Sequence, residues 1–325
     1  MAAPILSVRG LSVRYRGKEE AVYALQDVSF DLAPGRITAV VGESGCGKTT
    51  LALALLRLLP GEGEILAGSV QFEGRNLLHL SDSEMRSLRG RRLAIIFQDP
   101  VAGLNPVLSV GDQVAETLMA HLGLRRREAR RQAVEILERV GLPAPDRIAR
   151  AYPFQLSGGM CQRVMIAIAT ALDPAVLIAD EPTSALDVTV QAQILHQLDE
   201  LRRVRGTAIL LITHDFGVVA KVADDVSVMY AGRIVESGDV GELLKTPRHP
   251  YSRALLDTLP RVDSPGAPLA SIPGAPPELT EPAEHCPFLP RCGKALSRCR
   301  TEGPPPLEAL EGTHRVACYN PVWYG

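Results

Sequence analysis

A glycine-rich loop carrying one lysine has the composition of a phosphate-binding site. Residues 42–50 read GESGCGKTT, which satisfies the spacing G-x-x-x-x-G-K-[ST]. The glycines let several backbone amides turn inward around an anion, and Lys48 adds a positive charge for the outer phosphates. The Thr49 hydroxyl is an oxygen ligand suited to Mg²⁺. The predicted nucleotide contacts are Gly42, Glu43, Ser44, Gly45, Cys46, Gly47, Lys48, Thr49 and Thr50.

Two adjacent carboxylates follow a short apolar stretch further along the chain. The sequence AVLIADEP places Asp180 and Glu181 at the end of a short apolar run. Asp180 is predicted to hold Mg²⁺ and Glu181 to polarise an attacking water, which is the work of a general base. An ordinary acidic turn at the end of a strand would have the same composition, so this motif alone does not decide the chemistry.

A second predicted anion site lies in LSGGMCQR, residues 156–163. Ser157 is a good N-cap residue, and the amides of Gly158 and Gly159 lie free at the positive end of the helix that follows. An ordinary capped helix explains the same letters. If both anion sites serve one nucleoside triphosphate, this one faces a neighbouring subunit.

The elements that must position these residues indicate an α/β fold. From Ile5 to about Leu88 the pattern favours strands, and ITAVV and TLALALLRLL place a buried strand and a helix around the lysine loop. Residues 125–172 favour helices. AVLIAD and TAILLIT are the continuous apolar runs of strands buried on both faces of a parallel sheet, with a helix predicted between them.

Composition narrows the class further. The 325 residues are 46% hydrophobic and 22% charged, with a net charge of -2 and 4% aromatics. Such values predict a globular protein and disfavour binding of nucleic acid. The longest apolar stretch ends at Asp173 and Pro174, too short for a membrane span, and the first residues lack a signal-peptide pattern. The expectation is a cytosolic protein.

The order of the motifs resembles that of the ATP-binding subunits of ABC transporters. GESGCGKTT is followed by FQDP, LSGGMCQR, AVLIADEP, SALD and LLITHD. The resemblance implies that Gln98 contacts Mg²⁺ or water, that His214 contacts the γ-phosphate, and that Asp187 communicates across a dimer. Tyr15 resembles the aromatic residue that stacks on adenine, although a tyrosine on a strand face is the simpler interpretation.

The resemblance also implies an architecture and partners. It implies an ABC-type P-loop ATPase core with an antiparallel β subdomain and a helical subdomain at about 99–172, all within residues 1–259. It implies a head-to-tail dimer with a second ATPase subunit, ATP lying between Lys48 of one subunit and Ser157 of the other. Two membrane permease subunits and an extracytoplasmic solute-binding protein would be separate chains, which places this one peripherally on the cytoplasmic membrane face.

The C-terminal third narrows the resemblance to one group of importers. RHPYSRALLDTLP and SIPGAPPEL, with FQDPVAGLNP earlier, resemble the ATPases of dipeptide, oligopeptide and nickel importers. The transported solute is left open among dipeptide, oligopeptide, nickel and glutathione. The alternative function is that of a soluble ABC ATPase in DNA repair or translation, and such proteins tend to carry two cassettes or a long coiled-coil insertion.

Residues 260–325 are predicted to form an extension of their own. Nine of the 25 prolines fall within residues 260–290, which predicts an extended segment. Beyond Thr280 come Cys286, Cys292, Cys299 and Cys318. Four thiols in a cytosolic chain predict a shared ligand, and the resemblance implies a [4Fe–4S] cluster. Zinc and unligated thiols remain as alternatives.

Overall fold

The computed structural model describes residues 3–17, 20–184, 186–259 and 271–324. Backbone contacts divide the chain into two compact units. Unit 1 comprises Met1–Ile5, Leu32–Arg36 and His79–Ile212, and unit 2 comprises Leu6–Asp31, Ile37–Leu78 and Thr213–Gly325.

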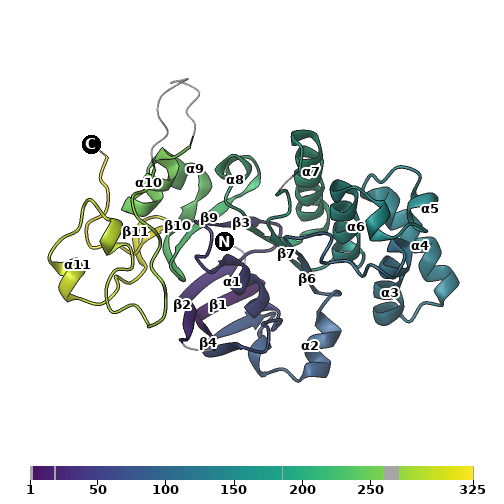
Figure 1. The fold of residues 1–325 in the computed structure, drawn as a ribbon, viewed down its shortest axis with the longest axis horizontal. Helices are drawn as coiled ribbons and strands as arrows, with labels where there is room; N and C mark the ends of the chain where they lie inside the picture. The colour runs from purple at the N-terminus through teal and green to yellow at the C-terminus, as the bar shows by residue number, and fades with distance from the viewer. Residues whose placement is uncertain (1–2, 18–19, 185, 260–270, 325) are drawn as a thin grey trace. The chain divides into compact units, whose positions relative to one another are not determined.

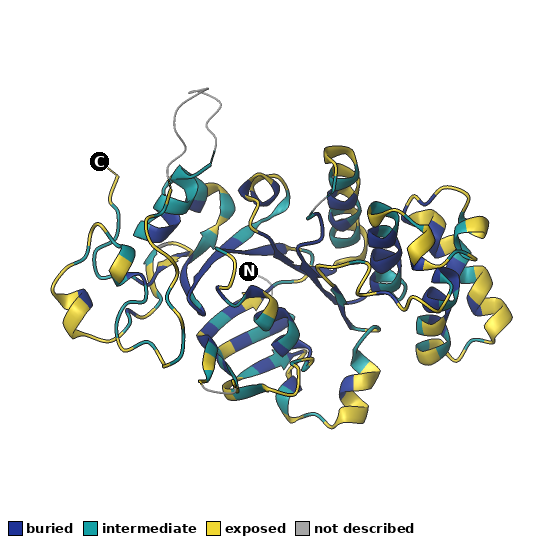
Figure 2. Ribbon diagram, viewed as in Figure 1, coloured by how far each residue is buried: buried dark blue, intermediate teal, exposed yellow. Residues whose placement is uncertain are grey.

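Unit 1 is built on parallel strands. Strand β7 (Val176–Asp180) pairs with β6 (Leu93–Ile96) on one side and β8 (Ala208–Ile212) on the other. Every residue of β7 and β8 is buried, as the dark blue strands in Figure 2 show. This confirms the prediction from the continuous apolar runs AVLIAD and TAILLIT.

Helices make up most of the rest of unit 1, and Figure 1 shows α3 to α6 gathered together. Helix α3 was not predicted from its own residue pattern, which favoured helices only from Arg125, but it lies within the helical subdomain at about 99–172 that the resemblance implied. It begins after Ser109, whose hydroxyl accepts a hydrogen bond from the Asp112 N–H. The helices are α2 (Asp82–Leu88), α3 (Val110–Leu122), α4 (Arg126–Arg139), α5 (Pro145–Ile148), α6 (Gly158–Thr170) and α7 (Val188–Arg205).

Unit 2 contains two groups of strands. The first is a four-stranded sheet in the order β2-β1-β4-β5, in which β1 and β4 pair antiparallel. The second begins with β3 and β9 in parallel and continues through β10 and β12 to β11 in antiparallel pairs. The strands are β1 (Leu6–Tyr15), β2 (Val22–Leu32), β3 (Ile37–Val41), β4 (Gly63–Phe72), β5 (Arg75–Asn76), β9 (Asp225–Tyr230), β10 (Arg233–Asp239), β11 (Glu308–Glu311) and β12 (His314–Val316).

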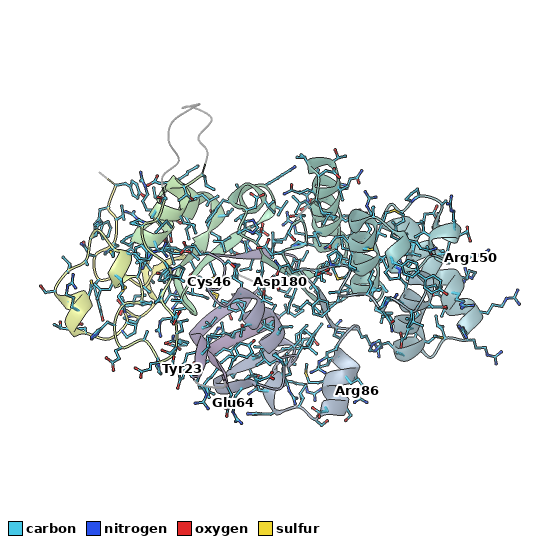
Figure 3. The ribbon with its side chains drawn as sticks, viewed as in Figure 1. Tyr23, Cys46, Glu64, Arg86, Arg150 and Asp180 are labelled. Atoms are coloured by element: carbon cyan, nitrogen blue, oxygen red, sulfur yellow. The ribbon has the colours of Figure 1, made fainter. Side chains whose placement is uncertain are left out.

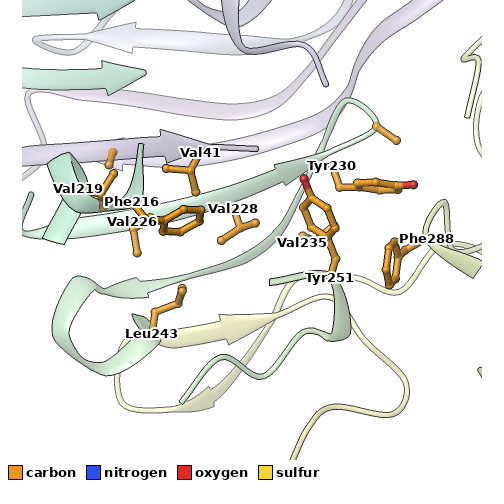
Figure 4. Packing of buried hydrophobic residues seen from close by; sticks show 12 residues of the cluster. Val41, Phe216, Val219, Val226, Val228, Tyr230, Val235, Leu243, Tyr251 and Phe288 are labelled. Carbon is orange, nitrogen blue, oxygen red and sulfur yellow. The ribbon is translucent and has the colours of Figure 1, made fainter. Parts of the chain in front are cut away.

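The helices described in unit 2 have four to eight residues each. They are α1 (Lys48–Leu55), α8 (Phe216–Val222), α9 (Val240–Lys245), α10 (Pro250–Asp257) and α11 (Arg298–Thr301). The apolar core of unit 2 includes Tyr230, Tyr251 and Phe288, whose rings lie together in Figure 4. Because Phe288 comes from the predicted extension and Tyr230 from β9, the two segments share one apolar core.

The proline-rich segment is only partly described, since residues 260–270 lie outside the described part of the chain. The predicted boundary between residues 259 and 260 also falls there. Residues 271–288 carry neither helix nor strand, as their prolines predicted. They are held by single bonds instead: the Tyr23 N–H donates to the Leu279 carbonyl at 2.7 Å, and the Ala283 N–H to the Gln26 side chain at 2.8 Å.

The buried carboxylate of Glu236, on β10, connects this strand to the C-terminal hairpin formed by β11 and β12. Glu236 accepts hydrogen bonds from the backbone N–H of Arg248 at 2.5 Å, from that of His249 at 2.9 Å, and from Nε2 of His314 at 2.7 Å. A buried carboxylate is stable only when it is paired in this way.

Among the described residues, no helix combines the length and the apolar character that a membrane span requires.

Candidate nucleotide-binding site

The phosphate loop of unit 2 runs between β3 and α1, as its sequence predicted. Gly45 and Gly47 have backbone φ angles of +82° and +105°, in the left-handed region that favours glycine. Gly47 is also the N-cap of α1, and a Cβ there would lie 2.4 Å from the carbonyl oxygen of Ala24. The loop can therefore follow this path only with glycine at position 47. Its amides lead into the N-terminus of α1, where the helix dipole favours an anion.

Lys48 lies at the start of α1 and points back into the loop. Its Nζ donates to the carbonyl of Gly42 at 2.8 Å and to that of Glu43 at 3.0 Å. Cys46, labelled in Figure 3, is buried beside it, with its Sγ 3.7 Å from Lys48 Nζ. Burial raises the pKa of the Cys46 thiol, although Lys48 opposes the shift, so Cys46 is a neutral thiol at pH 7. Of these four groups only the Lys48 ammonium is charged, because the Cys46 thiol and the two carbonyls are neutral.

Tyr15 lies beside the phosphate loop. Its hydroxyl donates to Thr50 Oγ1 at 3.2 Å, which joins the end of β1 to the first turn of α1. Thr49, the predicted Mg²⁺ ligand, is exposed on the same turn. Tyr15, Thr49 and Thr50 are therefore gathered with Lys48 in unit 2, while the adenine contact itself stays a prediction.

The two carboxylates lie at the end of β7 in unit 1. Asp180 is the last residue of the strand and is 3% exposed. Glu181 has a φ of +49°, an unusual backbone conformation for a residue other than glycine. The Glu181 N–H donates to the Ile212 carbonyl at 2.9 Å, and Ser184 donates back to the Glu181 carbonyl. Such conformations persist where neighbouring bonds enforce them and are concentrated at functional sites.

Ser157 caps α6, as the sequence predicted. Its Oγ accepts from the Met160 N–H at 3.4 Å, and Gly158 and Gly159 form the first turn of the helix. Gly158 is exposed, and nothing lies within 4 Å of the position that a Cβ on it would take. The start of α6 is therefore open to an anion.

The remaining predicted residues lie at the ends of elements. Gln98 is exposed just after β6, and His214 is exposed between β8 and α8. The Asp187 carboxylate accepts from the N–H groups of Thr189 and Val190, so its visible role is to cap α7. Gln98 and Asp187 belong to unit 1 and His214 to unit 2. Their contacts with nucleotide stay predictions.

The four C-terminal cysteines line one small cavity, together with His249 and Phe288. Burial raises the pKa values of Cys286 and Cys292, and that of Cys318 to about 12, so these thiols are neutral at pH 7. In the described part of the chain, no three His, Cys, Asp or Glu side chains are grouped so as to hold a metal ion. The iron–sulfur site predicted at these four cysteines is therefore not shown by the arrangement of the side chains.

Comparisons with known proteins agree with this distribution of motifs. Residues 25–184 match the family model described as ABC transporter, and residues 235–299 match the model of the oligopeptide/dipeptide transporter C-terminal region. Over 318 residues the chain is 46% identical to the oligopeptide transport ATP-binding protein OppD of Salmonella typhimurium, covering 98% of this chain and 94% of that protein. The chain belongs to the family of ATP-binding proteins of oligopeptide and dipeptide ABC transporters. The resemblance read from the six motifs is thereby confirmed.

Further relatives of this peptide-transporter ATP-binding family differ in length and similarity. The chain is 48% identical to OppD of Mycobacterium bovis over 97% of its own length, but it spans about half of that protein, 52%. Among solved structures, the dimeric ATP-binding cassette MJ0796 bound to ADP and Pi matches 72% of this chain with a TM-score of 0.66 and 28% identity. The predicted fold class, an ABC-type ATPase with an antiparallel sheet and helical parts, is confirmed.

Two residues at the phosphate loop were missed by sequence reasoning. The Tyr251 hydroxyl accepts from the Glu43 N–H at 3.0 Å, and the Arg291 guanidinium pairs with the Glu43 carboxylate at 2.7 Å. Neither periodicity nor spacing in the sequence indicates that either residue contacts the loop. The available signal was weaker: both lie within residues 235–299, the match to the oligopeptide/dipeptide transporter C-terminal region.

Proposed function

We propose that this chain is the ATPase subunit of an ABC importer, and that ATP hydrolysis on it drives uptake of dipeptides or oligopeptides. The observation that carries the proposal is the glycine-rich loop with Lys48 at the head of α1, in a chain whose C-terminal region matches that of peptide transporters. The soluble DNA-repair or translation ATPase is not favoured, because that class does not account for the match over residues 235–299.

Most of the predicted residues have a part in this proposal. The loop amides and Lys48 would bind the phosphates, while Thr49, Asp180 and Gln98 would hold Mg²⁺. Glu181 accepts a proton from the attacking water, and His214 contacts the γ-phosphate as charge develops on it. Ser157, Gly158 and Gly159 of a second ATPase subunit, paralogue or copy, close over the same ATP. No step needs a covalent intermediate, since positioned charges stabilise phosphoryl transfer.

The proposed partners follow from the peptide-importer assignment. Two membrane permease subunits would carry the solute, and an extracytoplasmic binding protein would deliver it. The chain itself would sit on the cytoplasmic face of the membrane as a peripheral subunit. Closing and reopening of the ATPase dimer would then drive the permeases between conformations.

Peptide uptake tests the importer directly. We expect Glu181→Gln to abolish uptake of a labelled peptide by cells or vesicles containing the complete transporter, because chemistry stops while the complex still assembles. The exposed Glu135→Gln on α4, whose partner is Arg131, serves as the control and should transport normally. Uptake that persists at the wild-type rate in Glu181→Gln would exclude coupling of transport to this site.

For the cysteine extension we propose a [4Fe–4S] cluster held by Cys286, Cys292, Cys299 and Cys318. Two facts support it: all four thiols line one cavity, and four thiolates are the donor set of such clusters. The thiols would have to deprotonate and move together for a cluster to form. When bound, the cluster would supply a one-electron redox centre or a structural staple.

Metal analysis tests the cluster. Protein purified without oxygen is expected to contain about four irons with matching sulfide per chain, and Cys292→Ser should lose both. Cys161→Ser, which changes a buried cysteine of unit 1, is the matched control and should keep them. Zinc without iron, or neither metal, would refute the cluster and leave the ATPase proposal intact.

A further inference from the structure

Glu43, the second residue of the phosphate loop, is attached to two residues far along the chain. Its N–H donates to the Tyr251 hydroxyl at 3.0 Å, across a separation of 208 residues. Its carboxylate accepts two hydrogen bonds from Arg291, at 2.7 and 3.0 Å, across 248 residues. A two-pronged pair between guanidinium and carboxylate holds both position and orientation. The phosphate loop is therefore anchored from the C-terminal region.

Arg291 is built into the structure and is not a surface side chain. It is 4% exposed, its Nε donates to the Pro273 carbonyl at 3.0 Å, and its Nη1 also reaches the Tyr230 hydroxyl at 3.3 Å. The guanidinium lies 5.7 Å from the ring centre of Tyr230 and 6.0 Å from that of Phe288. Figure 4 shows these two rings with Tyr251 in one apolar cluster. Breaking a charge pair in such surroundings is costly, because the partner charge remains largely removed from water.

Glu43, which Arg291 anchors, is also in contact with Lys48. The Glu43 carbonyl accepts from Lys48 Nζ at 3.0 Å, so a shift of Glu43 would displace the ammonium that ATP needs. The loop contains glycines with positive φ, and an anchor lowers the cost of ordering them around phosphates. Arg291 also neutralises a carboxylate that would otherwise repel a triphosphate.

We propose that Arg291 is a positioning residue for ATP: it neutralises and anchors Glu43, and so raises the affinity of the phosphate loop for nucleotide. The inference rests on the proposed ATP site. Arg291 and Tyr251 both lie within residues 235–299, the match to the peptide-transporter C-terminal region, and outside the ABC transporter match at 25–184. The region that matches the peptide-transporter C-terminal model thus raises the nucleotide affinity of a loop that lies in the ABC transporter match.

Calorimetric titration of the full chain with MgATP tests the proposal, in a Glu181→Gln background that prevents turnover. Arg291→Met is expected to raise the Kd for ATP about tenfold, within the usual range of coupling between sites. With Glu181 intact, the hydrolysis rate at saturating ATP should change less than about twofold while KM rises, because Arg291 does not touch the reacting atoms. Arg298→Met is the matched control, since Arg298 is an exposed arginine of the same region paired with Glu302.

A double-mutant cycle identifies the path of the effect. Because Arg291 acts through Glu43, Arg291→Met should change the Kd less than about twofold once Glu43→Gln is present. Effects that multiply as if independent would overturn the proposal. So would an Arg291→Met protein that folds and binds ATP like the wild type.

Two further variants keep the test decisive. If Arg291→Met does not fold, Tyr251→Phe and Glu43→Gln each still remove one anchor, and wild-type affinity in both would overturn the proposal. Lys48→Ala separates this inference from the proposed function. Binding lost in Lys48→Ala but unchanged in Arg291→Met would refute the role of Arg291 alone, whereas unchanged binding in Lys48→Ala would refute the ATP site itself.

Discussion

Replacing Glu181 by glutamine is expected to lower ATP hydrolysis by at least about a hundredfold while leaving MgATP binding within about twofold. The amide has nearly the shape of the carboxylate but cannot accept a proton, and a general base contributes roughly 10²–10⁴ in rate. The local structure should survive, because the Glu181 backbone is held by its bond to the Ile212 carbonyl and by Ser184, neither of which involves the carboxylate.

The measurement is phosphate release at saturating MgATP, with binding followed separately by titration. A folded Glu181→Gln protein that keeps more than about a tenth of the wild-type rate would mean that another group accepts the proton. The loss of rate without loss of binding is what distinguishes a base from a phosphate ligand, since Lys48→Ala should weaken binding itself.

Removing the carboxylate of Glu236 is expected to destabilise the protein by about 3–5 kcal/mol, the usual cost of breaking a buried charge pair. Glu236 is fully buried and receives hydrogen bonds from two backbone N–H groups and from His314. Glu236→Ala deprives the Arg248 and His249 amides of their acceptor in a site without access to water. Urea unfolding should show the loss, whereas Glu308→Ala, an exposed change on β11, should stay within about 0.5 kcal/mol.

The same carboxylate gives stability a pH dependence. Burial lowers the pKa of His314, but its hydrogen bond and charge interaction with Glu236 outweigh burial, so the pKa is raised above its ordinary value of 6.5. The stability that this pair contributes is fully present below pH 6.5 and is lost as the pH rises through the raised pKa. The gap between wild type and Glu236→Ala should therefore narrow at alkaline pH without closing, because the two amide bonds do not titrate. A gap that is constant or that widens would contradict the assignment.

The residues expected to bind and hydrolyse ATP could be predicted from the sequence because each of their motifs is local. GESGCGKTT, AVLIAD and LSGG each combine a strand or helix with the residues that the element presents at its end, and the structure has β3, α1, β7 and α6 at those places. A loop of this kind needs glycine where φ is positive and lysine one position later, whatever the rest of the chain does. Local geometry and local composition determine each other here.

Helix α3 and the cysteines show the limits of reasoning from local patterns. Helix α3 depends on burial of Val110, Val114 and Leu118 within unit 1, and its amphipathic pattern was not recognised in the sequence. The four cysteines were predicted to share a ligand; the structure places all four around one cavity, and the ligand stays a proposal. Their spacing gives no information on burial, which raises the pKa values of the Cys286, Cys292 and Cys318 thiols and is a property of the packed extension.

By itself, the sequence determined the family, the order of the elements and the positions of the groups expected to bind and hydrolyse ATP. Only the tertiary structure decided that Arg291 and Tyr251 contact Glu43. It also decided that Glu236 accepts hydrogen bonds from two backbone amides and from His314. The physical reason is that motifs act over a few residues, within one strand, turn or helix. Contacts across 208 or 248 residues depend instead on how an apolar core of aromatic rings brings distant segments together, and they leave no period or spacing in the chain.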